Sequence, residues 1–80
     1  MSHKHAKRFQ EIGRRIAFYR KRRGLTQQEL ADRVGISKSY LSKIEAPATD
    51  MTFSLAVLFD IANELEVEVE MMFRREWEGE

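Results

Sequence analysis

The sequence predicts an all-α domain, a compact bundle of four to five short helices. Three observations predict this fold class. Apolar residues recur at helical spacings of three and four along most of the chain. Capping residues and glycines divide that pattern into short segments. The chain has 80 residues, 42% hydrophobic and 34% charged, which is a globular mixture of the size of one domain.

The composition argues against several classes of protein. There is no cysteine, which excludes a disulfide scaffold, a thiolate zinc site and a cysteine nucleophile. The longest apolar run, Leu55 to Phe59, is far too short to cross a membrane. No basic-then-apolar leader opens the chain. We therefore expect a cytoplasmic protein.

Charge is divided unevenly along the chain. Residues 1–45 hold twelve Lys/Arg and four Asp/Glu, a net charge of +8, whereas residues 46–80 hold two and nine, a net charge of −7. This asymmetry fits a protein with one face for a polyanion, and it also fits a surface that neutralises itself.

The first helix is predicted over residues 9–23, after a polar and basic arm at residues 1–8. Its apolar positions are three or four residues apart, and Gly24 follows as the stop. They are Phe9, Ile12, Ile16 and Tyr19.

The second helix, 27–34, has the clearest start signal in the chain. Thr26 and Glu29 form a capping box, in which the hydroxyl and the carboxylate each accept from the other residue's amide. Leu25 and Leu30 flank the cap as a hydrophobic staple.

A third helix is predicted over 38–45, after a stop at Gly35 and a cap at Ser37. Leu41 and Ile44 are three residues apart and must face the core. The side of this helix that faces away from them is polar or cationic. It carries Ser39, Ser42 and Lys43, with Lys38 and Tyr40 on its two flanks.

A loop over 46–52 leads to a fourth helix capped by Thr52 or Ser54. Its predicted core positions are Leu55, Leu58, Phe59, Ala62 and Leu65, with Ile61 beside them. Residues 66–78 are ambiguous because 66–70 alternate as a strand does. The later apolar residues have helical spacing, and we favour a short helix. They are Val69, Met72, Phe73 and Trp77.

Two short helices joined by a turn with glycine, with the small Ala31 at their crossing, form a helix-turn-helix. The exposed side of the second of them suits the major groove of DNA. The basic residues before it suit phosphates.

The segment from Leu25 to Glu45 resembles the phage-repressor and Cro-like helix-turn-helix family, also called Xre-type. The resembling features are the Thr-Gln start, Ala31, Gly35, Ser37 and the Ile-Glu ending. The likeness extends over about residues 9–73. It implies a lambda-repressor-like domain that binds operator DNA as a two-fold homodimer, usually as a transcriptional repressor. Such a protein would be bacterial or from a phage and associated with the nucleoid.

The resemblance also implies roles for individual residues. Gln27 matches a glutamine that contacts a phosphate and braces the recognition helix. Lys38 stands where many relatives have a glutamine that reads adenine, and lysine there would read guanine or hold a phosphate. Ser39, Ser42 and Lys43 match groove-facing positions, and Tyr40 matches an aromatic residue set against the DNA backbone.

The chain departs from the family after Glu45, where relatives carry basic residues and this chain has the uncharged or acidic 46–50. The basic run Arg20–Arg23 would compensate in part, and Arg22 and Arg23 are its predicted phosphate contacts. We expect the homodimer to form through the acidic carboxyl end, which bears Met71, Met72 and Phe73, with residues 74–80 as a tail that contributes to it.

Two other functions remain open from the sequence. The acidic carboxyl half would suit an antitoxin or another protein-interaction module that binds a basic partner, such as a toxin. A controller of restriction-modification genes would use the same DNA-binding chemistry. We expect no enzyme, because no histidine in the folded body offers a neutral-pH base. We expect no cofactor and no metal, since His3 and His5 lie on the arm without a third ligand.

Overall fold

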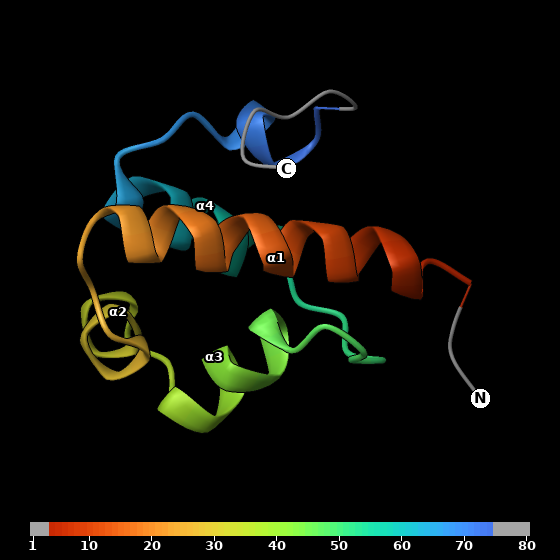
Figure 1. Ribbon diagram of the computed structural model, residues 1–80, viewed down its shortest axis with the longest axis horizontal. Coiled ribbons are helices and arrows are strands. Elements are labelled where there is room, and N and C mark those ends of the chain that lie inside the picture. The colour runs from red at the N-terminus through yellow and green to blue at the C-terminus, as the bar shows by residue number, and fades with distance from the viewer. Residues whose placement is uncertain (1–3, 75–80) are drawn as a thin grey trace.

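The computed structural model describes residues 4–74, and within them the chain forms four α-helices, one 3-10 helix and no strand (Figure 1). The predicted all-α bundle is therefore confirmed. The elements are α1 (Ala6–Arg22), α2 (Gln27–Val34), α3 (Lys38–Glu45), α4 (Leu55–Leu65) and η1 (Val69–Met72). The long α1 crosses the middle of the molecule, with α2 and α3 on one side, η1 on the other and α4 behind it.

The first helix begins earlier than predicted, at Ala6 rather than at Phe9. The carbonyl of His5 accepts from the amides of Arg8 and Phe9, at 3.0 and 3.2 Å, so the first turn closes there. Ala6 is only 4% exposed. The prediction of a basic arm over residues 1–8 was therefore wrong from Ala6 onward. The helix extends over this polar sequence because the small side chain of Ala6 is buried.

Three helices end in the same hydrogen-bonded motif, with one residue in the left-handed region. After α1 this residue is Gly24 (φ 72°), after α2 it is Gly35 (φ 85°), and after α4 it is Glu66 (φ 58°). In each case the next amide donates back across the turn, as from Leu25 to the Arg20 carbonyl at 3.1 Å. Of these three residues, Glu66 is the one that carries a side chain in this conformation.

The predicted caps of the second and third helices are confirmed. Thr26 and Glu29 form both bonds of the capping box, and the Ser37 hydroxyl accepts from the Tyr40 amide at 3.0 Å. Both helices have the predicted ranges because their start and stop signals are local. Ser54, not Thr52, caps α4, through a bond of 3.1 Å from the Val57 amide.

The structure corrects the predicted core face of α4. Leu55 and Phe59 are 60% and 47% exposed, so their prediction as core residues was wrong. Leu58, Ala62 and Leu65 are buried as predicted, and Ile61 is buried with them, so the helix packs through the side that these four residues share. Spacing could not distinguish the two flanks because apolar residues cover more than half of this helix.

Among the described residues after α4, the chain forms one short 3-10 helix, η1, where a strand and a short helix were both considered. Met72 is fully buried, and the Arg15 guanidinium donates to its carbonyl at 2.7 Å. Phe73 is 54% exposed, so it does not share the buried side of the turn with Met72. Trp77 and most of the predicted tail 74–80 lie outside the described residues.

The core lies between α1 and the three other α-helices. Its fully buried large side chains come from every helix of the bundle. They are Ile16, Leu30, Leu41, Ile44, Leu58, Ile61, Leu65 and Met72. Within residues 4–74, no helix combines the length and the apolarity that crossing a bilayer requires.

Candidate nucleic-acid interface

The start of α2 is fixed by its capping box. The Glu29 amide donates to the Thr26 hydroxyl at 3.0 Å, and the Thr26 amide donates to the Glu29 carboxylate at 2.8 Å. The bond from the Thr26 backbone is the main reason that the pKa of Glu29 lies below its usual value, with smaller effects from the Thr26 side chain and nearby Arg33. The cap therefore prefers the ionised carboxylate, and it sets the position of Gln27 in the first turn.

The exposed face of α3 gathers most of the residues predicted to contact DNA. Leu41 and Ile44 are fully buried and hold the opposite face against the core. Lys38, Ser39, Ser42 and Lys43 are all exposed. Tyr40 is half-buried and packs on the edge of the core. The structure thus presents a short helix whose free side carries hydroxyls and two ammonium groups.

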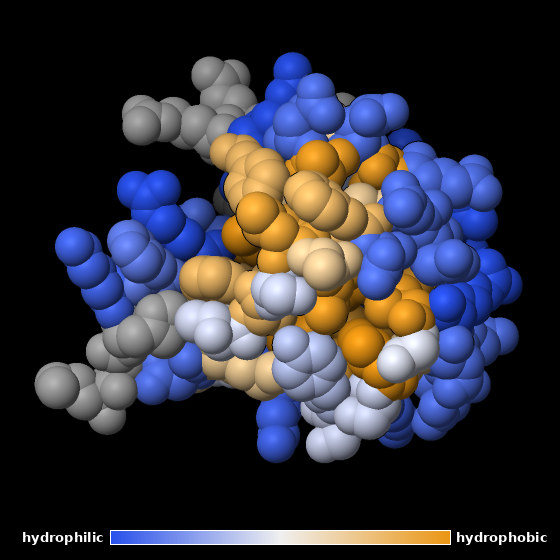
Figure 2. Space-filling model, turned by 180° about the vertical axis from the view of Figure 1, so that it is seen from behind, coloured by the Kyte–Doolittle hydropathy of each residue, from blue (hydrophilic) through white to orange (hydrophobic). Residues whose placement is uncertain are grey.

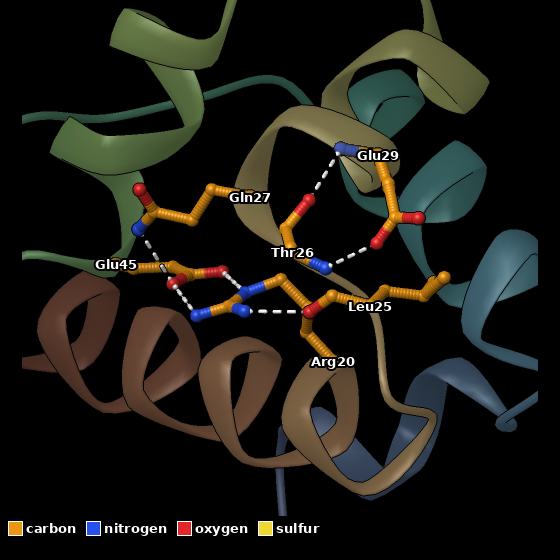
Figure 3. A network of polar contacts seen from close by, with 6 residues as sticks. All are labelled: Arg20, Leu25, Thr26, Gln27, Glu29 and Glu45. Atoms are coloured by element: carbon orange, nitrogen blue, oxygen red, sulfur yellow. Dashed lines mark hydrogen bonds and ion pairs between the residues drawn. The ribbon is translucent and has the colours of Figure 1, made fainter.

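A buried ion pair ties the end of α3 to α1 (Figure 3). The Arg20 guanidinium donates to both oxygens of Glu45, at 2.8 and 3.0 Å, and to the Leu25 carbonyl at 2.7 Å. The two side chains are 9% and 5% exposed. Arg20 belongs to the basic run read as a phosphate-contacting surface, yet its charge is turned inward. The signal was its position four residues after Ile16, on the apolar stripe of the helix.

Gln27 joins the same network. Its side-chain amide donates to Glu45 Oε1 at 2.9 Å, so one carboxylate links the ends of α1 and α3 to the start of α2 (Figure 3). A side-chain amide has two N–H donors, and this bond uses one of them. Gln27 is half-buried, and the structure brings it together with the recognition helix. The predicted bracing role therefore has a physical basis.

A close helix crossing at Gly13 was missed by the sequence analysis. A Cβ added at Gly13 would overlap the carbonyl oxygen of Ile44 and come within 3.0 Å of its carbonyl carbon. Only glycine lets the backbones of α1 and α3 approach this closely. A glycine inside a helix costs about 1 kcal/mol relative to alanine. A glycine in the middle of the predicted first helix was therefore the available sign of a close contact there. Ala31, the small residue predicted at the α2–α3 crossing, is fully buried.

Arg22 and Arg23 are exposed but lie apart from this network. The Arg22 guanidinium carbon lies 5.8 Å from the centroid of the Phe18 ring, within cation–π range. Arg23 forms an ion pair of 2.9 Å with Glu66, at the end of α4. The structure therefore does not gather these two arginines with Gln27 at the end of α3.

The loop after α3 is held against α1. The Gln10 side chain donates to the Thr49 carbonyl at 2.7 Å, and the rings of Phe9 and Phe53 meet edge to face with centroids 5.0 Å apart. These contacts give the loop, whose charged residue is Asp50, a fixed path.

No metal site forms among residues 4–74, since no three His, Asp or Glu side chains come together there. His5 lies at the start of α1, and His3 lies outside the described residues.

Comparison with known proteins identifies similar chains. A family model described as helix-turn-helix matches residues 16–71. The transcriptional regulator SlrR of Bacillus subtilis is 45% identical over 65 residues, which is 81% of this chain and 42% of SlrR. This chain thus spans less than half of that regulator.

Two solved structures share the fold. The biofilm regulator SinR in complex with DNA is 38% identical with a TM-score of 0.72, over 79% of this chain and 98% of that one. The restriction-modification controller C.AhdI from Aeromonas hydrophila is 28% identical with a TM-score of 0.78, over 89% of this chain and all of that one.

Proposed function

Because the chain belongs to the Cro-like, Xre-type helix-turn-helix family, we propose that it is a sequence-specific DNA-binding transcriptional regulator. It acts as a repressor on a two-fold operator, which it binds as a homodimer in the bacterial cytoplasm. The observation that carries this proposal is the exposed polar face of α3, held on a rigid base by the Arg20–Glu45 pair and the Gly13 crossing. A side chain that reads a nucleobase must be held in a fixed position, and these contacts fix the position of α3.

The residues of this face divide into two kinds of contact. Lys38 and Lys43 carry compact charges that suit the acceptors of guanine or a phosphate, and Ser39 and Ser42 offer short hydroxyls to base edges. Gln27 would give its second amide N–H to a phosphate, since Glu45 already holds the first. Tyr40 would lie against the DNA backbone at the flank of the groove.

Arg22 and Arg23 are proposed as phosphate contacts away from the groove. Arg23 would have to exchange Glu66 for a phosphate. An ion pair this exposed contributes only ~0–1 kcal/mol, so the exchange costs little.

Footprinting on the DNA upstream of the protein's own gene tests this function. We expect a protected, two-fold-symmetric site whose half-sites lie ~34 Å apart. Affinity for it should fall steeply with salt, with a log–log slope of about −4 to −8 for a dimer. No detectable binding at ~50 mM salt, or binding that salt does not change, would reject the proposal.

A restriction-modification controller is a second candidate. The likeness to C.AhdI, which this chain matches over that protein's whole length, favours it. The DNA chemistry would be the same, and only the controlled genes would differ. A footprint upstream of restriction-modification genes, rather than upstream of an isolated gene, would select it.

A protein-interaction role, such as that of an antitoxin, is favoured by the exposed carboxylates of Glu66, Glu68 and Glu70. Their neutralisation should weaken the binding of a basic partner and leave the salt slope of DNA binding unchanged. If neutralisation left the binding of the basic partner unchanged, this role would be excluded.

A further inference from the structure

A basic cleft lies where the start of α1 meets η1. It consists of two adjoining hollows of about 360 and 580 Å³, and Arg8, Arg15 and Phe73 line both of them. In Figure 1 the cleft lies across α1 from the recognition helix α3. In Figure 2, where the start of α1 is at the left, the side chains at that end are strongly hydrophilic. The proposed DNA-binding face therefore does not account for this cleft.

The larger hollow concentrates positive charge. Among the described residues that line it, five are Lys or Arg, whereas Glu11 is the one carboxylate. The five cations are Lys4, Lys7, Arg8, Arg15 and Arg74. A cleft lined mainly by one sign of charge focuses its field and raises the local concentration of ions of the opposite sign. The charge of the cleft therefore favours an anionic ligand.

Arg15 gives the cleft a buried cation whose position is fixed. The residue is only 6% exposed, and its guanidinium donates to the Met72 carbonyl at 2.7 Å. Arg8, Glu11 and Arg15 are three or four residues apart, so they share the side of α1 that borders the cleft. A guanidinium is a planar fork of N–H donors that suits the paired oxygens of a carboxylate or a phosphate. The bond to Met72 thus orients Arg15 before a ligand binds.

The smaller hollow adds an apolar surface to these cations. It is lined in part by Phe9, Ile12, Met72 and Phe73. Phe73 is 54% exposed and also lines the larger hollow, so the apolar surface and the cations are contiguous. Each hollow is of the size of known small-molecule sites, about 300–1,000 Å³. A ligand that carries both an acidic group and an apolar part would use the whole cleft.

We propose that this cleft binds a small amphipathic organic anion. Its carboxylate or phosphate group meets Arg8 and Arg15, and its apolar chain or ring lies on Ile12 and Phe73. The charge-assisted hydrogen bonds fix the acidic group, and burial of the apolar part removes its surface from water. This inference goes beyond the proposed function and does not depend on it, because the ligand contacts neither α3 nor Gln27.

Titration of the full chain with octanoate and with octyl phosphate, followed by nuclear magnetic resonance of the backbone amides, tests the cleft. We expect at least one of them to shift amides of α1 and η1 around the cleft. It should bind at least ~10-fold more tightly than octanol, which lacks the charge, and than inorganic phosphate, which lacks the chain. Arg8→Gln and Phe73→Gln should each weaken its binding by ~10-fold. Arg14→Gln, at an exposed arginine of α1 outside the lining, is the matched control and should leave the binding unchanged. All three replaced side chains are exposed, so the variants should fold.

Several results would overturn this proposal. One is that neither probe shifts the amides around the cleft. Another is that octanol or inorganic phosphate binds as tightly as the probes, which would mean an apolar patch or an adventitious ion only. Equal losses in Arg8→Gln and Arg14→Gln would mean a general attraction to the basic half of the chain. Saturation with a DNA duplex beforehand should change the affinity for the probe little, because the cleft lies across α1 from α3. A duplex that abolishes probe binding would assign these cations to the DNA-binding surface instead.

Discussion

Arg20 of α1 and Glu45 at the end of α3 form a bidentate, buried ion pair, with Nε–Oε2 at 2.8 Å and Nη2–Oε1 at 3.0 Å. The pair joins residues that are 25 positions apart in the sequence. It fixes the recognition helix to the longest helix of the bundle, so its effect on function comes through position and not through contact with DNA.

Arg20→Met should destabilise the protein strongly, because it leaves the Glu45 carboxylate buried without its cation. The expected loss in the free energy of unfolding is ~3–5 kcal/mol. Arg23→Met is the matched control, since it removes an exposed pair with Glu66 that is worth ~0–1 kcal/mol. Urea denaturation measures both. Equal losses would mean that the Arg20–Glu45 pair is not buried as described.

Gly13→Ala should destabilise the protein although alanine is the better helix former. Helix propensity alone predicts a gain of ~1 kcal/mol. The added methyl group would meet the Ile44 carbonyl, and overpacking of this kind costs ~1–3 kcal/mol. The melting temperature decides between the two effects by the sign of its change. A rise would show that α1 and α3 do not cross closely at this point.

Glu66→Gly and Glu66→Gln should differ in stability by about 1 kcal/mol in favour of glycine. Both remove the ion pair with Arg23, but only glycine relieves a side chain at a φ of 58°. Gly24 and Gly35 already occupy the equivalent positions after α1 and α2. Urea denaturation of the two variants measures the cost of placing a side chain in the left-handed conformation. Equal free energies of unfolding would contradict such a cost at this position.

Acid should weaken the α2 cap. The pKa of Glu29 is lowered from 4.5 by its bonds to Thr26, so the folded state binds this proton less readily than the unfolded state. The carboxylate therefore stabilises the fold above the unfolded pKa, and this contribution is lost as pH falls through the folded pKa. Glu29→Gln should melt below the parent at pH ~7, and the gap should narrow as the pH falls below the unfolded pKa and through the lowered folded pKa. A gap that is constant with pH would contradict the charged cap.

The sequence was sufficient for the parts of the fold whose signals are local. Thr26, Glu29 and Ser37 predicted the starts of α2 and α3, because a cap needs only residues three positions apart. The exposed side of α3 was also predictable from a local signal. Because Leu41 and Ile44 must face the core, the polar residues of this helix must lie on the opposite side.

Other features depended on contacts between distant segments. Arg20 looked like one cation in a basic run until Glu45 was placed beside it. Leu55 and Phe59 matched the helical spacing of core residues, yet α4 is turned so that their flank is exposed. Spacing defines the faces of a helix, but only tertiary packing selects which face is buried.

The role of the α3 face in reading DNA is tested most directly by measuring the affinities of the parent and of Lys43→Ala for the operator and for single-base variants of it. Lys21→Ala, an exposed lysine of α1, is the control. We expect Lys43→Ala to lose ~1–3 kcal/mol of binding free energy per half-site. It should also lose the preference for one base pair in each half-site, whereas Lys21→Ala should keep every base preference. A Lys43→Ala protein that binds the operator and all variants as the parent does would contradict DNA recognition through this face.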